Sequence, residues 1–271
     1  MRYIKESFKY IFINGKGAHF ICLFFISLIP AALLAHAFPA ENFVLNIFYP
    51  PEYQNWAEVW LSYFKVPSSF VALIVGFITC VIAMAGLCGA LINHFRIGDL
   101  KLNKIFHSFN DYFFPAILYS LTILIVFATT FTLYTLLAYL WYIFESVIAY
   151  EVLSVISLFV LAILTIYITS SLTLWLPTMC IKGAYKNSFF QAFSQAQSKQ
   201  KSFLPSKVIA ALIIAVTAIL SALVTKVWFV SWIITSIGYA CAFAYVIISI
   251  TITYFDENKI PRDCGHPYKW R

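Results

Sequence analysis

Few residues in this chain combine a reactive side chain with a place in or beside a long apolar segment. His36 is the ionisable residue near the end of the first apolar run, and such a residue in an apolar environment is a candidate for function. Hydroxyl side chains recur along the third and fourth apolar runs, among them Thr130, Thr169 and Ser170. They could line a polar path for a solute, or bond to their own helix carbonyls and pack helices together. His36, Thr130, Thr169 and Ser170 are therefore a candidate polar path.

Catalytic chemistry has little support in the sequence. Metalloprotease, serine-hydrolase, phosphate-loop and dinucleotide-binding motifs are all missing, and the six cysteines show no Cys-x-x-Cys spacing. Acidic residues are nearly missing from the middle of the apolar runs, where a proton relay would need them. We predict no catalytic residue, no cofactor and no metal site. An enzyme acting on lipid would have to use the ionisable residues of one face: His94, Asp99, His107, Asp256 and Asp263.

The composition describes an integral membrane protein. Hydrophobic residues make up 62% of the 271 residues and charged residues only 11%, whereas a soluble domain has about 25% charged residues. Several apolar runs reach the roughly 20 residues that a helix needs to cross a bilayer, and a β-barrel fits poorly. We predict an all-α helical bundle, a single transmembrane domain over residues 1–271, with six membrane spans: His19–Phe38, Phe70–Ile92, Phe113–Ala138, Val152–Leu176, Val208–Lys226 and Val230–Tyr254.

Basic residues predict the orientation of these spans. Sixteen of the 18 Lys and Arg residues precede odd-numbered spans or follow even-numbered ones, while the alternate loops hold only Lys65 and Lys226. The positive-inside rule then places both termini in the cytoplasm of a multi-pass protein of the plasma (inner) membrane. The net charge of +7 fits the anionic inner leaflet better than a nucleic acid, so membrane lipids are the expected partners.

The first apolar run also fits a second interpretation. A basic start, the run from Phe20 to Leu34 and the small residues Ala35 and Ala37 together match a cleavable signal peptide. The segment before the run is long and amphipathic, which favours an uncleaved first span.

Three polar stretches resemble one another in position and pattern. The stretches "KESFKYIFING", "LNKIFHSFNDY" and "KNSFFQAFSQAQSK" each precede an odd-numbered span. Each pairs two large apolar residues four apart, which places both on one helical face: Phe8 with Phe12, Ile105 with Phe109, and Phe189 with Phe193. Basic residues, among them Lys5, Lys104 and Lys186, occupy other faces. This pattern predicts helices lying in the plane of the inner membrane surface.

The chain then reads as three repeated units, each an interfacial helix followed by a helical hairpin. The units cover roughly residues 1–92, 93–176 and 177–255, and residues 256–271 form a cytoplasmic tail. The alternative is that amphipathic helices of this kind are common and resemble one another by composition. A parallel repeat of this sort differs from the inverted repeats of many transporters.

An aromatic stretch precedes the second span. Trp56 and Trp60 are four residues apart, with Tyr63 and Phe64 close behind. This spacing predicts a helix at the outer interface whose aromatic face meets lipid. A second interpretation makes Trp56 and Trp60 a lid or docking surface over a cavity between spans.

Two segments carry a resemblance to a known family. "KNSFFQAFSQAQSKQKSFLPSK" after span four and "TYFDENKIPRD" after span six resemble bacterial six-helix membrane proteins of the type that also forms the membrane domain of some glycerophosphodiester phosphodiesterases. Phe255 and Asp256 are the tightest part of the match. The resemblance implies a polytopic inner-membrane protein of unassigned role, and it brings no catalytic residues. The soluble phosphodiesterase domain is missing from this chain, so that chemistry is not expected.

Three hypotheses about function remain. The first is a non-enzymatic membrane protein that interacts with lipids or scaffolds a protein partner, including a second copy of itself. The second is a transporter, or a transporter subunit, for a small or amphiphilic solute. The third is an intramembrane lipid-modifying enzyme.

Overall fold

The protein is described by a computed structural model that covers residues 2–14, 18–65, 69–97, 102–144, 146–182 and 185–260. Within these ranges every regular element is a helix. Six helices are long and apolar enough to cross a membrane, which confirms the prediction of an all-α, multi-pass membrane protein. The six are α2 (Ala18–Ala37), α5 (Ser69–Ile97), α6 (Leu102–Ile143), α7 (Val147–Ser171), α10 (Gln200–Leu223) and α11 (Trp228–Glu257).

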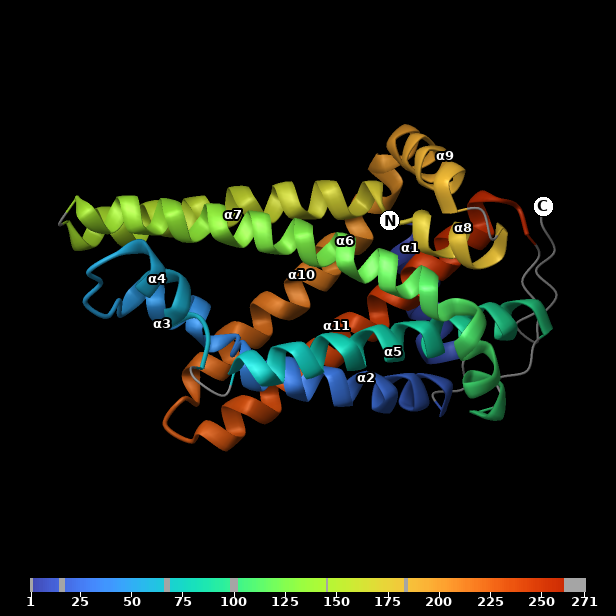
Figure 1. The fold of residues 1–271 in the computed structure, drawn as a ribbon, viewed down its shortest axis with the longest axis horizontal. Coiled ribbons are helices and arrows are strands. Elements are labelled where there is room, and N and C mark those ends of the chain that lie inside the picture. The colour runs from blue at the N-terminus through green and yellow to red at the C-terminus, as the bar shows by residue number, and fades with distance from the viewer. Residues whose placement is uncertain are drawn as a thin grey trace.

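The six long helices form a closed ring. Each packs against its neighbour in the chain, and α7 contacts α10 while α11 returns to contact α2 (Figure 1). Helix α11 is the most buried of the six and α7 is the least buried, because α7 turns most of its surface outward. Three hairpins therefore stand side by side around the ring. This arrangement is compatible with a threefold repeat, which stays a prediction from the sequence.

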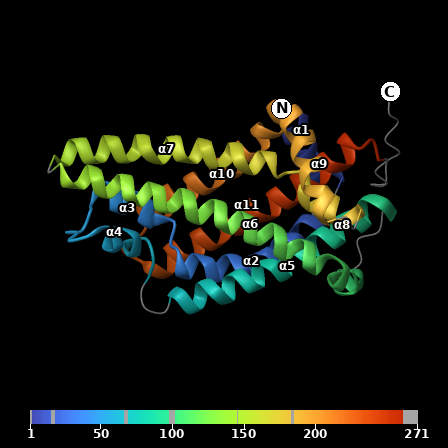
Figure 2. The same ribbon diagram turned by 45° about the horizontal axis from the view of Figure 1, so that its top comes forward.

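Short helices occupy the two ends of the bundle. At one end lie α1 (Arg2–Lys9) with a π-helical segment (Tyr10–Asn14), α8 (Trp175–Lys182) and α9 (Tyr185–Ser198). Figure 2 shows α1 and α9 crossing the direction of the long helices. This is the orientation expected of helices at a membrane surface. At the opposite end lie α3 (Glu41–Phe48) and α4 (Trp56–Ser62).

The start and end of the described chain meet at the α1 end. The Arg2 guanidinium lies 3.6 Å from the Asp256 carboxylate. A common end for both is what an even number of spans requires. The side of the membrane on which this end lies stays a prediction from the basic residues. Helix α11 continues to Glu257, into the predicted tail, so the last helix is longer than the span predicted from the sequence.

Two predicted boundaries differ from the structure. Helix α6 runs without interruption through the stretch predicted as a separate interfacial helix, although Figure 1 shows its first turns bent away from the rest. Pro115 lies inside this helix and explains a bend, since proline removes a backbone hydrogen bond. The predicted fourth span Val152–Leu176 is instead broken by a turn at 172–174, after which the chain forms α8.

Helix α8 fills the α1 end of the ring. Leu174, Trp175, Leu176 and Met179 are all buried there in one large apolar cluster with residues of α5, α6, α10 and α11. A second, aromatic cluster lies at the α3 and α4 end, around Phe131. Burial of this apolar surface against neighbouring helices is what orders the short elements, because eight-residue helices are not stable alone.

Candidate functional site

The connection between the first two long helices folds into a helical cap. Asn55 begins α4, and its side chain accepts a hydrogen bond of 3.1 Å from the Glu58 backbone N–H, the usual way to start a helix. Asn42, at the start of α3, donates to the backbone carbonyls of Ser62 and Tyr63 at 3.3 and 3.1 Å. These bonds fix α3 and α4 relative to each other, so the cap is an ordered part of the fold.

The two predicted lid residues lie on the face of the cap that meets α6. The Trp56 indole N–H donates to Thr135 Oγ1 at 3.1 Å. The Trp60 ring packs on Phe64 at 4.6 Å between centroids and on Phe131 at 6.1 Å. Both side chains are partly buried. Part of each side chain therefore contacts protein, with Trp60 in the aromatic cluster around Phe131, and contact of the exposed part with lipid stays a prediction from the sequence.

A pocket of about 250 Å³ opens beside this cap, and we name it the cap pocket. Three parts of the chain meet there: the link from α2 to α3, the end of α4 and the start of α11. His36, the ionisable residue of the predicted polar path, lies in its wall. The pocket is lined by Ala35, His36, Pro39, Glu41, Asn42, Phe64, Lys65, Trp228 and Trp232.

Hydrogen bonds between helices hold the walls of the cap pocket. The Trp232 indole donates to the Ala32 carbonyl at 3.0 Å, which ties α11 to α2. Tyr239 donates to the Phe38 carbonyl at 3.0 Å, about two turns further along α11 at ~3.6 residues a turn. Because the partners come from distant parts of the chain, the pocket is part of the tertiary structure.

Charges of both signs line the cap pocket. The Glu41 carboxylate accepts a hydrogen bond of 3.3 Å from Thr235 on α11. The Lys65 ammonium lies 4.9 Å from the centre of the Trp228 ring, a cation–π geometry. The described residues contain no group of three metal-ligating side chains. The arrangement suits the binding of a small molecule that carries both a positive and a negative charge.

The other residues of the predicted polar path do not line this pocket. Thr130 donates to the Val126 carbonyl at 2.9 Å, and Thr169 donates to the Thr165 carbonyl at 2.8 Å, both within their own helices. Ser170 donates to the Tyr167 carbonyl at 2.7 Å. These bonds are typical of hydroxyls that pack helices together. Of these four residues, His36 alone lines the cap pocket, so the structure does not assemble the four into one site.

Residues predicted at the inner membrane surface divide into exposed and packed groups. The Phe8 and Phe12 rings are stacked with 6.1 Å between centroids, and Phe12 is 72% exposed. Phe189 and Phe193 are also stacked, at 5.8 Å. Both pairs therefore share a helical face, as their spacing predicted. Among the other predicted residues, Lys5 is exposed, and the Phe109 ring packs on the Phe113 ring with 5.0 Å between centroids. The side chains of Lys104, Ile105 and Lys186 lie outside the described residues.

Phe189 also contacts the protein core. Its ring lies 5.0 Å from the Trp175 ring of α8 in an edge-to-face arrangement. Phe190, the next residue, is 75% exposed. Helix α9 therefore covers α8 with one face and leaves another face exposed.

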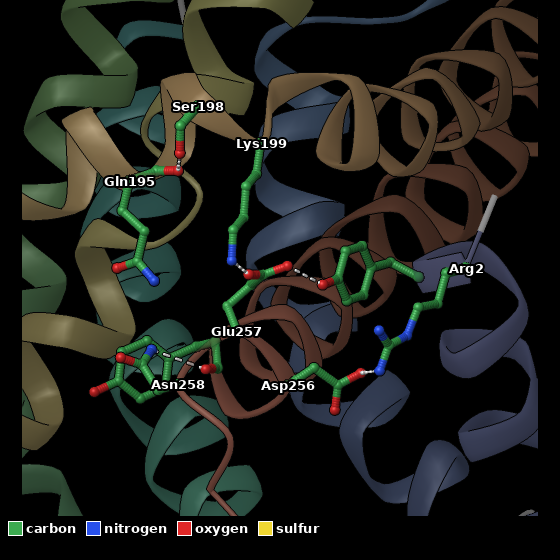
Figure 3. A network of polar contacts seen from close by, with 9 residues as sticks. Arg2, Gln195, Ser198, Lys199, Asp256, Glu257 and Asn258 are labelled. Carbon is green, nitrogen blue, oxygen red and sulfur yellow. Dashed lines mark hydrogen bonds and ion pairs between the residues drawn. The ribbon is translucent and has the colours of Figure 1, made fainter. Parts of the chain in front are cut away.

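Polar contacts fix α1 to the end of α11, and Figure 3 shows them from close by. The Glu257 carboxylate accepts a hydrogen bond from the Tyr3 hydroxyl on one oxygen and pairs with the Lys199 ammonium on the other. Arg2 pairs with Asp256 in the same region. Burial, together with the bond to Glu257, raises the pKa of Tyr3 above its ordinary value. The tail predicted from residue 256 thus begins with two residues that hold α1.

Several cap-pocket residues were missing from the sites predicted by sequence. Glu41 and Lys65 are two of the four charged residues in the connection between the first two spans, and Trp228 and Trp232 are aromatic residues near the end of a span. Each residue can be picked out from the sequence by itself. Their proximity in space cannot, because it depends on how the connection between the first two spans folds.

Comparison of the chain with models of known protein families, with curated proteins and with solved structures finds no match. The six membrane-spanning helices stand without a family assignment, and the resemblance to the six-helix bacterial proteins stays a prediction from the sequence.

Proposed function

We propose that this protein is a non-enzymatic, lipid-interacting membrane protein whose cap pocket binds the headgroup of a zwitterionic phospholipid. The observation that carries the proposal is the joint presence of Lys65, Glu41 and two indole rings in one pocket at the end of the membrane-spanning bundle. A lysine ammonium binds phosphate as a point charge. A carboxylate and an indole face together bind an ammonium group.

The size of the pocket supports a headgroup. Its volume of about 250 Å³ lies below the roughly 300–1,000 Å³ typical of pockets for drug-sized molecules, so a whole lipid does not fit. Apolar side chains continue beyond the pocket rim, since Val227, Trp228, Phe229 and Val230 are all exposed. These residues offer a surface for the acyl chains of a lipid whose headgroup occupies the pocket.

Transport has weaker support. The hydroxyls proposed for a polar path bond within their own helices, and none of them reaches the cap pocket. Binding at one end of the bundle without a path favours lipid binding over transfer of a solute. A scaffolding role for a protein partner or a second copy is a separate proposal, to which the exposed apolar surface of α7 lends an area for contact.

The test is native mass spectrometry of the full chain in mixed detergent and lipid. Phosphatidylethanolamine, which is zwitterionic, is compared with anionic phosphatidylglycerol. We expect retained phosphatidylethanolamine at a fixed stoichiometry, and at least tenfold weaker retention in Lys65→Gln and Glu41→Gln. Lys226→Gln is the matched control, because Lys226 is exposed at the same end and does not line the pocket. Equal retention in all variants would contradict the proposal.

A further inference from the structure

A group of buried polar side chains lies where α1 crosses α10 and α11, and we name it the inner seam. It comprises Ser7 of α1, Lys207 of α10, and Ser249 and Thr253 of α11. Exposure is 6% for Lys207 and at most 1% for the three hydroxyl residues. The three hydroxyl oxygens have no hydrogen-bond partner among the described residues. For Lys207, too, the described part of the chain supplies no ion pair.

Two contacts between α10 and α11 fix the register of one helix against the other. The helices run antiparallel, and they approach so closely near Gly238 that an added Cβ would overlap the Thr217 side chain. An ion pair joins them again at the α1 end. Between these two points, equal rise along both helices places Lys207 level with Ser249. The described geometry thus brings the buried residues Lys207 and Ser249 to the same depth.

Helix α1 brings Ser7 to this level. The Tyr3 ring lies 5.7 Å from the Phe203 ring of α10. Ser7 is one helical turn after Tyr3, and the ring of the next residue, Phe8, lies 5.8 Å from the Tyr245 ring of α11, one turn before Ser249. Since α1 also packs against α11, Ser7 lies between the two long helices. Thr253 is one turn beyond Ser249 on the same face of α11, so it belongs to the same junction.

The four side chains of the inner seam are all hydrogen-bond donors. An ammonium and three hydroxyls can all donate hydrogen bonds, and none of the four side chains that define the seam is a carboxylate. Of the acidic residues near the seam in sequence, Glu6 beside Ser7 is partly exposed, Asp256 pairs with Arg2, and Glu257 binds Tyr3 and Lys199. A buried charge without a partner costs several kcal/mol, and buried polar groups are almost always hydrogen-bonded. A bound anion would satisfy the amine and the hydroxyls together.

We propose that the inner seam binds a small inorganic anion of halide size. A halide is a single atom and accepts hydrogen bonds from all sides, so it needs little room between packed helices. The seam is buried beneath α1, which its contacts with Asp256 and Glu257 hold in place. This cover favours a free ion over a lipid phosphate. Exchange of the ion then requires α1 to move, so the anion and the docking of α1 stabilise each other.

The experiment measures the thermal unfolding midpoint of the purified full chain while chloride replaces gluconate at constant ionic strength. We expect the midpoint of the wild type to rise saturably with chloride. Lys207→Met should abolish this dependence, and Lys226→Met, which removes an exposed lysine, should keep it. Methionine has a similar length and no charge, so the fold should tolerate it. Should Lys207→Met not fold, Ser249→Ala serves instead, with an apparent chloride Kd raised at least tenfold.

Separate titrations identify the source of the anion. Bromide should act like chloride, whereas inorganic phosphate and phosphatidylglycerol should have at most a tenth of its effect. A wild-type midpoint that does not respond to chloride would overturn the proposal. So would a chloride response that survives in Lys207→Met, or stabilisation by phosphatidylglycerol alone that Lys207→Met abolishes, which would assign the seam to a lipid phosphate.

Discussion

The Lys65 ammonium lies 4.9 Å from the centre of the Trp228 ring and joins the first hairpin of the bundle to the last. Lys65 follows α4, and Trp228 begins α11, so this contact closes one side of the cap pocket. An exposed cation–π contact contributes only about 0.5–1 kcal/mol. Its importance lies in position, because it places a cation and an aromatic face together where a lipid headgroup would meet the bundle.

The contact between Trp56 and Thr135 should stabilise the cap. Trp56→Phe removes the indole donor of this 3.1 Å hydrogen bond, and the expected loss is about 1 kcal/mol of unfolding free energy. Thermal unfolding in detergent measures the loss. Thr135→Val should have a similar effect, and the double variant should lose less than the sum of both. Strictly additive losses would show that the two residues do not interact.

The close approach of α10 and α11 depends on Gly238. Gly238→Ala places a Cβ where the Thr217 side chain lies, and we expect a loss of about 1–3 kcal/mol in unfolding free energy. Gly76→Ala is the milder comparison, because its added Cβ would lie 3.1 Å from the end of Leu34 and 3.3 Å from Leu33 Cβ, whereas the nearest Thr217 atom would lie 2.0 Å from the Cβ added at Gly238. Thr217→Gly should restore part of the stability in the Gly238→Ala background. Equal melting temperatures of the two alanine variants would contradict the close packing of α10 against α11 at Gly238.

Long apolar runs made the six membrane spans predictable. About 20 consecutive apolar residues have few alternatives to a membrane helix, whatever their neighbours are. The break before α8 has a local cause in Pro177, whose ring cannot follow a helical residue at Thr173 without a clash with its carbonyl. Residues 172–174 themselves contain no glycine or proline. Leu172 and Leu174 are buried in the large apolar cluster, and this packing, which local sequence does not specify, sets the direction in which α8 continues.

Alkaline pH should release α1. Burial and the bond to Glu257 raise the pKa of Tyr3 above its ordinary value of about 10. The folded protein therefore holds this proton more tightly than the unfolded chain does. Its stabilising contribution is complete below about pH 10 and is lost as the pH rises through the raised folded-state pKa.

Hydrogen exchange of the α1 amides, expressed as protection factors relative to α9, measures this release between pH 8 and pH 11. Wild-type α1 should lose protection as the pH approaches 11. Tyr3→Phe has no hydroxyl proton to lose, so its α1 protection should be lower at pH 8 and nearly constant above it. An equal alkaline loss in Tyr3→Phe would assign the effect to other groups.

Two adjacent phenylalanines of α9 should behave differently. Phe189→Ala removes the ring that packs on Trp175, with an expected loss of about 1–3 kcal/mol for a partly buried side chain. Phe190→Ala changes a residue that is 75% exposed, and stability in detergent should stay within about 0.5 kcal/mol. Thermal unfolding of both variants in detergent measures the two losses of stability. A larger loss in Phe190→Ala would place the packed face of α9 elsewhere.

The candidate site was predictable in its parts but not in its assembly. His36 was singled out as the ionisable residue beside the first span, and it lines the cap pocket. Lys65 stood out as a basic residue outside the basic loops. Glu41 lies in the connection between spans, and its approach to Thr235 of α11 follows from the fold of the cap. Helical periodicity describes single helices and does not specify such contacts between them.

The most direct test of headgroup binding is photo-crosslinking with a phosphatidylethanolamine that carries the reactive group on its headgroup. Headgroup binding in the cap pocket predicts crosslinked peptides at residues around Lys65 and Trp228, with competition by unlabelled phosphatidylethanolamine and little competition by phosphatidylglycerol. Crosslinks spread evenly along the exposed faces of the long helices, or confined to the α1 end, would contradict it.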